Sequence, residues 1–327
     1  MYEEELKIAI AAVRQASELC QHVRATLVTD ETITKQDRSP VTIADLAAQA
    51  AMSSILQMTF SDDPLVAEED THLLQQEEHA QNRARVFAEV RRLQPHLDDT
   101  AILAAIDRGD HAGGPEGRFW TMDPIDGTKG YIRGDQYAVA LALIEDGEVV
   151  AGALGCPHLP CKTMHNTTQR GVIMAASKGA GAISLSMDGS TVTPLQVSVA
   201  TSGSEAVLCE SVEAAHTRQG RSSRVSEILG VHLPPVRIDS QCKYAIVARG
   251  EATTYLRIPS ANSTYEEKIW DHAAGAIVVT EAGGRVTDTL GVPLDFSLRR
   301  TLRNNKGVVA TNGALHDVVI EALAATQ

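Results

Sequence analysis

The sequence predicts a two-domain chain that mixes helices and strands throughout, with an α+β half followed by an α/β half. Its 327 residues are about twice the length of a typical domain. Apolar residues recur at helical spacing in some segments and form short continuous runs in others, which is the pattern of packed helices and sheets. Pro157 and Pro160 interrupt this pattern. We therefore expect domains at 1–155 and 156–327.

Two helices are expected at the start of the first domain. Apolar positions repeat at helical spacing over 3–27, and the polar stretch 30–40 predicts a loop. Thr42 is then the predicted N-cap of a second helix that ends near Met58. This start places Asp45 in the first turn, where the helix dipole favours a carboxylate.

A short strand at 65–67 follows and ends in three acids, Glu68, Glu69 and Asp70. The turn Asp146-Gly147 separates two later apolar runs and predicts a hairpin. The other elements expected in this domain are a helical region at 71–107, a glycine-rich loop at 111–118, and strands at 119–122, 138–144 and 149–154.

The second domain repeats the alternation of strands and helices. Gly283-Gly284 closes one of its helices as a typical C-cap. The expected strands are 172–176, 192–199, 205–209, 236–239, 253–258 and 308–310, and the expected helices are 213–229, 242–250, 271–282 and 314–324.

The net charge of −13 excludes several classes of partner. A nucleic-acid binder needs a basic surface to replace phosphate counterions, and so does a protein that adheres to anionic lipid. No apolar run reaches the ~18 residues of a membrane span, and the acidic N-terminus lacks the basic start of a signal peptide. We expect a cytoplasmic protein without a nucleic-acid, membrane or protein partner. An anionic substrate would then need a divalent cation to attract it.

The five cysteines form an odd, scattered set, which is typical of reduced thiols. Cys156 and Cys161 lie close to His158 and His165, so a zinc site is an alternative. Because no second Cys/His pair follows at zinc-finger spacing, buried or loop thiols are the favoured interpretation.

Carboxylates at the ends of predicted elements carry the chemistry. Asp123 and Asp126 flank Pro124, which stiffens the turn so that both carboxylates and the Ile125 carbonyl can face one point. Oxygen ligands of this kind suit Mg²⁺. Gly127 and Thr128 follow, and their backbone N–H groups would meet a phosphate there. Taken singly, each acid also fits a solvated turn or an N-cap, but together the acids predict a multi-metal phosphate site.

Three motifs show a resemblance to a known family. Glu68-Glu69, Asp123-Pro124-Ile125-Asp126-Gly127-Thr128 and Trp270-Asp271-His272-Ala273-Ala274-Gly275 resemble the signature of the inositol monophosphatase superfamily of magnesium-dependent, lithium-sensitive phosphatases. Gly117-Arg118-Phe119-Trp120, Lys129-Gly130-Tyr131-Ile132-Arg133-Gly134 and Glu267-Lys268-Ile269 resemble its bisphosphate nucleotidase branch. The resemblance covers nearly the whole chain. It implies a layered α-β-α-β-α sandwich and hydrolysis of 3′-phosphoadenosine 5′-phosphate to AMP within sulfur assimilation, and it leaves open whether the corresponding phosphosulfate is also a substrate.

The resemblance also implies residue roles and cofactors. Two or three Mg²⁺ ions would bind in the site, and Li⁺ would inhibit by replacing one of them. The implied metal ligands are Glu68, Asp123, the Ile125 carbonyl, Asp126 and Asp271; the implied water-activating pair is Asp45 and Thr128; and the implied substrate-binding residues are Gly127, Thr128, His216, Ser240, Lys243 and Arg257.

Lys243 and Arg257 can be interpreted either as substrate-binding residues or as ordinary surface residues. They would neutralise the second phosphate of the nucleotide in a chain that is net negative, yet solvated surface cations are the default for these residue types. His216 is likewise interpreted either as a substrate contact or as an ordinary histidine at a helix end. The alternatives are an inositol monophosphatase or inositol polyphosphate 1-phosphatase with the same metals, and a non-catalytic sensor of phosphate or metal.

Overall fold

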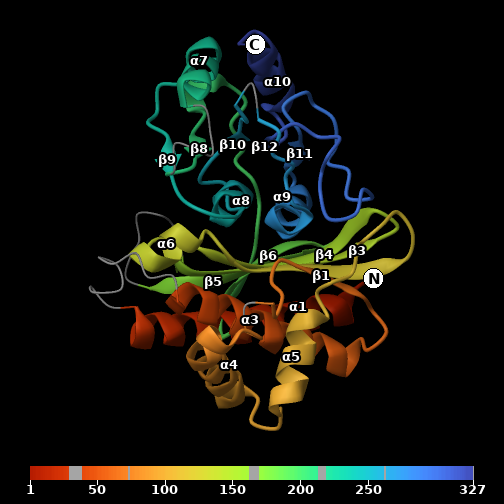
Figure 1. Cartoon of the computed structure of the whole chain (residues 1–327). Coiled ribbons are helices and arrows are strands. Elements are labelled where there is room, and N and C mark those ends of the chain that lie inside the picture. The colour runs from red at the N-terminus through yellow and green to blue at the C-terminus, as the bar shows by residue number, and fades with distance from the viewer. Residues whose placement is uncertain (29–38, 73, 162–168, 213–218, 261–262, 327) are drawn as a thin grey trace.

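The computed structural model describes residues 1–28, 39–72, 74–161, 169–212, 219–260 and 263–326. Two sheets and three layers of helices alternate in space (Figure 1). This arrangement is the α-β-α-β-α sandwich that the family resemblance implied. In the described residues, no helix is both long enough and apolar enough to cross a membrane.

The first sheet has seven strands in the order β1-β2-β3-β4-β5-β6-β7. Strands β1 and β2 are parallel and all later neighbours are antiparallel. The parallel pair brings the carboxyl ends of two strands to one edge of the sheet, which positions the acids described below. The bounds are β1 Leu65–Ala67, β2 Arg118–Asp126, β3 Ala138–Glu145, β4 Glu148–Pro160, β5 Arg170–Ser177, β6 Gly181–Ser186 and β7 Val192–Pro194.

Helices α1 (Glu3–Leu27) and α3 (Ser39–Thr59) cover one face of this sheet, with α4 (Ala80–Leu93) and α5 (Asp99–Asp107) packed beneath them (Figure 1). Their apolar residues form one core with the inward-facing side chains of the sheet. A short 3₁₀ turn, Glu77–His79, precedes α4, and α6 (Thr128–Arg133) follows β2 directly.

The second sheet has the order β11-β12-β10-β8-β9. Helices α8 (Cys242–Ala248) and α9 (Ala273–Glu281) lie between the two sheets and share a second core with both, whereas α7 (Gln219–Leu229) and α10 (His316–Ala324) cover the outer face (Figure 1). The strand bounds are β8 Leu208–Glu210, β9 Val236–Arg237, β10 Thr254–Arg257, β11 Arg285–Thr287 and β12 Val308–Thr311, with 3₁₀ turns at Gly203–Glu205 and Ile269–Asp271.

The change from one sheet to the other comes later than the expected boundary near residue 156. Strand β4 runs through Pro157 to Pro160, and the first sheet continues to Pro194. The ladder between β4 and β5 shifts register between Cys156 and Pro160. An irregular ladder of this kind tolerates prolines, because a proline cannot donate a ladder hydrogen bond.

Several element boundaries also differ from the sequence-based expectation. Helix α3 begins at Ser39, not at Thr42, so Asp45 lies in the second turn. Pro40 fits the start of the helix because the first turn needs no N–H donor there. The helical region 71–107 is divided, since α4 ends before Pro95. Of the predicted helix 213–229, residues 213–218 lie outside the described residues.

Candidate active site

The end of strand β2 supplies two of the predicted metal ligands. Asp123 is 2% exposed, and its Oδ1 accepts a hydrogen bond of 3.0 Å from the Ile125 N–H. The pairing of β2 with β3 shifts register between Asp123 and Asp126. The expected stiff turn is therefore a bulged end of a strand, and the bulge is where both carboxylates turn toward the cleft.

Glu68 lies beside this bulge because β1 runs parallel to β2. Ala67 pairs with Met122, so the residues that follow, Glu68 and Asp123, are neighbours at the sheet edge. Glu68 remains open to solvent. Although the residue as a whole is exposed, partial desolvation of its carboxylate and then the charge of Asp126 raise the pKa of Glu68, whereas a hydrogen bond with Asp123 and the charge of Lys268 lower it.

Asp45 approaches the same edge from α3 and is 6% exposed. Burial, followed by the charges of Glu69 and Glu68, raises the pKa of Asp45 well above its usual range. One turn further along α3, Gln49 Nε2 donates to the carbonyls of Glu69 (2.7 Å) and Ile106 (2.9 Å), and its Oε1 accepts from the Glu69 N–H (3.1 Å). The fully buried Gln49 thus fixes the backbone of the acidic segment relative to α3.

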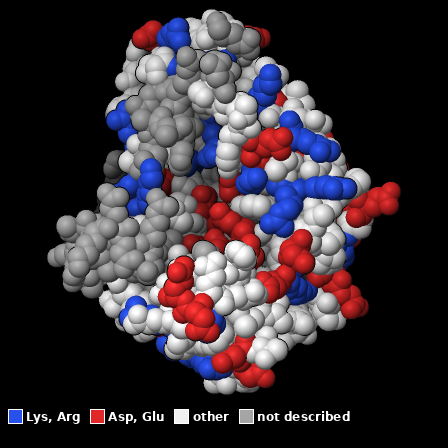
Figure 2. All heavy atoms as spheres, viewed as in Figure 1, with Lys and Arg blue, Asp and Glu red and all other residues white. Residues whose placement is uncertain are grey.

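Asp271 faces these acids from the second half of the chain, at the end of the 3₁₀ turn before α9. Burial, followed by the charge of Asp126, raises the pKa of Asp271 well above its usual range. Burial is also the main cause that raises the pKa of Asp123, with Glu68 and Asp126 next. Figure 2 shows acidic side chains gathered in a hollow between the two halves.

This donor set fits magnesium. The clustered carboxylates raise one another's pKa, and a divalent cation with oxygen ligands would favour their charged forms. In the described residues, the ligand atoms that lie within 4.8 Å of one another belong to Glu267, Asp271 and His272. The carboxylates of Glu68, Asp123 and Asp126 do not form so close a group with Asp271. No zinc-like grouping of Cys156 and Cys161 occurs there either, and His165 lies outside the described residues.

Gly127 and Thr128 form one wall of a pocket next to the acids. Gly127 has φ +93°, and a Cβ at this position would lie 2.9 Å from the Ser240 Cβ. The Gln241 N–H donates to Asp126 Oδ2 (2.5 Å), which attaches the start of α8 to the end of β2. The Thr128 side chain is exposed, and it makes no hydrogen bond with Asp45 in the described part of the chain. The predicted pair therefore comes from two elements, α3 and α6, with no hydrogen bond between the two side chains among the described residues.

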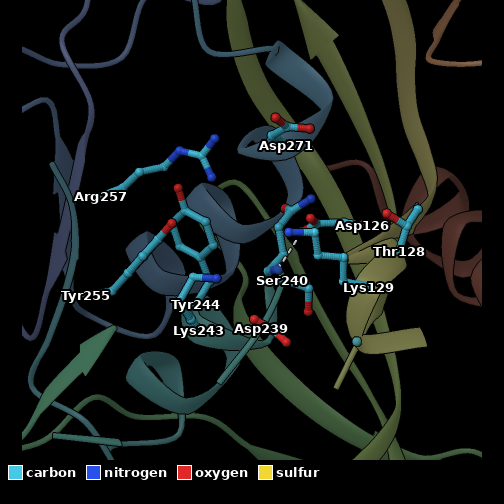
Figure 3. A pocket seen from close by; sticks show the side chains of 13 residues that line it. Asp126, Thr128, Lys129, Asp239, Ser240, Lys243, Tyr244, Tyr255, Arg257 and Asp271 are labelled. Atoms are coloured by element: carbon cyan, nitrogen blue, oxygen red, sulfur yellow. Dashed lines mark hydrogen bonds between the residues drawn. The ribbon is translucent and has the colours of Figure 1, made fainter. Parts of the chain in front are cut away.

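The opposite wall carries the predicted cations (Figure 3). Lys243 is 4% exposed, and its Nζ lies 5.2 Å from the centroid of the Tyr255 ring. Burial lowers the pKa of Lys243. In the described residues Lys243 has no ion-pair partner, whereas Arg257 Nε lies 2.8 Å from Glu267 Oε1. The pocket of about 680 Å³, mouth included, thus contains one buried cation without an ion-pair partner.

Sequence reasoning missed a buried network behind this wall. Tyr244 Oη and His272 Nδ1 are 2.7 Å apart, and His272 Nε2 lies 3.1 Å from Glu267 Oε2. Burial alone would raise the pKa of Glu267, but the hydrogen bond with His272 and the charge of Arg257 lower it to about 2. The network makes Glu267, Asp271 and His272 a weaker candidate for a metal group, since two of the three already have partners. Glu267 and His272 flank the Trp270-Asp271 motif, but nothing in their spacing indicated a shared network.

Most of the predicted site residues converge on this cleft. The acids Asp45, Glu68, Asp123, Asp126 and Asp271 occupy one side, and Gly127, Thr128, Ser240, Lys243 and Arg257 line the adjoining pocket. His216 lies outside the described residues.

The comparisons with known proteins agree with this fold and cleft. The model of the inositol monophosphatase family matches residues 1–327, so the chain belongs to that family. Among solved structures, Mycobacterium tuberculosis SuhB has a TM-score of 0.63 at 20% identity and covers 99% of this chain and 97% of its own. CysQ from Bacteroides thetaiotaomicron has a TM-score of 0.62 at 20% identity, with 95% and 98% covered.

More similar relatives carry a particular enzyme name. A protein of Schizosaccharomyces pombe called 3′(2′),5′-bisphosphate nucleotidase is 42% identical over 341 residues, which span 99% of this chain and 96% of the relative. An Oryza sativa protein of the same name is 43% identical over 338 residues, with 98% and 94% covered.

Proposed function

We propose that this chain is a 3′(2′),5′-bisphosphate nucleotidase that hydrolyses 3′-phosphoadenosine 5′-phosphate to AMP and phosphate. The observation that carries the proposal is the juxtaposition of an acidic cleft with a pocket that holds the buried Lys243. The acidic cleft would hold the metal ions that bind one phosphate of the substrate. The buried Lys243 beside the cleft would pair with a second phosphate. The names of relatives at about 42% identity support the same substrate class.

The metal site belongs to this proposal. Glu68, Asp123, the Ile125 carbonyl, Asp126 and Asp271 would hold Mg²⁺. When bound, Mg²⁺ neutralises the negative charge of the reacting phosphate and makes the attacking water more acidic. Two or three ions per site, inhibition by Li⁺ and a reducing cytoplasmic setting remain parts of the proposal. The five free cysteines are consistent with that setting.

The residues of the chain position the water and take its proton. Thr128 at the start of α6 would orient the water toward phosphorus, and Asp45 would accept the proton. Asp45 suits this role by its position, because it is 6% exposed and approaches the acidic cleft from α3. Thr128 and Asp45 make no hydrogen bond to each other in the described residues. The attacking water would therefore bridge the two side chains in the complex with substrate, so that its proton can reach Asp45.

The pocket walls would hold the remainder of the nucleotide. Lys243 would bind the 5′-phosphate through a charge-assisted hydrogen bond. Arg257 would contribute less charge, because Glu267 already compensates it. Ser240 has φ +64° and lies against Gly127, so it forms a fixed edge of the pocket. An inositol phosphate would leave Lys243 without a phosphate partner, and the relatives' names do not favour that alternative.

Phosphate release tests the proposal directly. The assay compares 3′-phosphoadenosine 5′-phosphate with inositol 1-phosphate at saturating Mg²⁺, with Asp126→Asn as the inactive control. We expect a large preference for the nucleotide. A preference for inositol 1-phosphate would refute the nucleotidase and leave a metal-dependent phosphatase of the same family.

A further inference from the structure

Arg300 holds together backbone segments that lie far apart in the sequence. Its Nη1 donates to the carbonyls of Gly109 and His111, each at 3.1 Å, and its Nη2 donates to the carbonyl of Ala67. The guanidinium is half-buried and forms no ion pair among the described residues. Its hydrogen-bonding capacity is therefore used on backbone rather than on a carboxylate.

The same guanidinium lies over an aromatic ring of the 3₁₀ turn Ile269–Asp271. Its carbon is 4.9 Å from the centroid of the Trp270 ring. The Arg300 carbonyl accepts from the Ile269 N–H at 3.2 Å, and Thr301 forms a bridge with Lys268. The segment that contains Arg300 is thus attached to the chain just before α9.

Two of the residues that Arg300 contacts directly precede proposed metal ligands in the sequence. Ala67 directly precedes Glu68, and Trp270 directly precedes Asp271. We propose that Arg300 is a positioning residue that sets the separation of Glu68 and Asp271, which come from opposite halves of the chain. This inference rests on the metal site of the proposed function and assigns that site a residue outside its motifs.

The backbone on either side of Glu68 is closely packed and hydrogen-bonded. A Cβ on Gly109 would lie 2.6 Å from the Ala67 Cβ, so the two backbones are in close contact. Gln49 fixes the following residue, Glu69, from the side of α3. Only an arginine can reach three carbonyls with a planar fork and stack on a ring at the same time, because a lysine has a single point charge.

Arg108 provides a matched control. It also donates to three backbone carbonyls, those of Ser53 (3.0 Å), Phe60 (3.0 Å) and Asp63 (2.6 Å). It is also half-buried, and desolvation lowers its pKa just as it lowers the pKa of Arg300. None of its three carbonyls adjoins a proposed metal ligand. Replacing Arg108 therefore removes a comparable set of backbone hydrogen bonds, none of which adjoins Glu68 or Asp271.

The experiment measures Mg²⁺ binding to the full-length, metal-free protein by titration calorimetry, and its thermal midpoint in parallel. We expect Arg300→Gln and Arg108→Gln both to lower the midpoint. Only Arg300→Gln should weaken Mg²⁺ binding, by about 10- to 100-fold, as is usual when a residue that orients metal ligands is lost. Compared with Arg300→Gln, Arg300→Lys should restore part of the thermal midpoint but not the Mg²⁺ affinity. It also supplies the measurement if Arg300→Gln does not fold.

Two results would overturn the inference. Unchanged Mg²⁺ affinity in the Arg300 variants, while Asp126→Asn loses binding, would leave Arg300 a structural residue and the metal site intact. If Asp126→Asn leaves the Mg²⁺ affinity unchanged, the proposed metal site is refuted, and the positioning role of Arg300 is refuted with it.

Discussion

Replacing Lys243 with methionine removes a buried charge while nearly preserving the volume of the side chain. Lys243 is 4% exposed and lies over the Tyr255 ring at 5.2 Å, so water does not compensate its charge as it does at the surface. If the 5′-phosphate is its partner, the variant loses a charge-assisted contact and leaves that phosphate without its cation. The effect should then depend on whether the substrate carries a 5′-phosphate.

The magnitude follows from the strength of such a contact. A hydrogen bond to a charged group contributes about 1.5–3 kcal/mol. At about 1.4 kcal/mol per decade, this corresponds to a loss of roughly 10- to 150-fold in kcat/KM. The loss should lie mainly in KM, because the contact is remote from the reacting phosphorus.

The assay measures kcat/KM for 3′-phosphoadenosine 5′-phosphate and for 3′-AMP, which lacks the 5′-phosphate. We expect the full loss with the first substrate and a much smaller loss with the second. Lys178→Met is the control, since Lys178 is exposed and pairs with Glu148 away from the cleft. Equal losses on both substrates would refute the assignment of Lys243 to the 5′-phosphate.

Three further results are expected. Asp126→Asn should abolish turnover while far-ultraviolet circular dichroism shows a folded protein, because the variant loses a proposed metal ligand; near-normal activity at saturating Mg²⁺ would contradict the ligand assignment. Li⁺ should inhibit at millimolar concentration in a manner that is not competitive with substrate and that depends on Mg²⁺, as rate measurements at several Mg²⁺ concentrations will show. His316 lies buried between the hydroxyls of Thr287 and Thr311, and desolvation lowers its pKa to about 4. Since the unfolded imidazole binds its proton near pH 6.5, the stability due to neutral His316 is present above that pH and is lost as the pH falls toward 4. Between pH 6.5 and pH 4, the free energy of unfolding measured with denaturant should fall less for His316→Asn than for the wild type.

The local patterns of the sequence determined a large part of this structure. The apolar periodicity of residues 3–27 predicted α1, and the continuous apolar runs around Asp146-Gly147 predicted the β3–β4 hairpin. These predictions are confirmed because burial of an apolar face depends on spacing along one element. The acidic motifs also placed Asp123 and Asp126 at an element end, since a strand that ends in acids directs them toward solvent or a metal.

Tertiary structure alone decided which polar groups meet. Gln241 donates to Asp126 across 115 positions of sequence, and Arg300 reaches Ala67 across 233. No period along the chain encodes such pairs, because a polar side chain takes its partner from whichever element packs beside it. The compensation of Arg257 by Glu267, which leaves Lys243 as the buried cation without an ion-pair partner in the described pocket, arises in the same way. The sequence thus specified the chemistry of the site, whereas the packing of two sheets around α8 and α9 decided which charges remain available for a substrate.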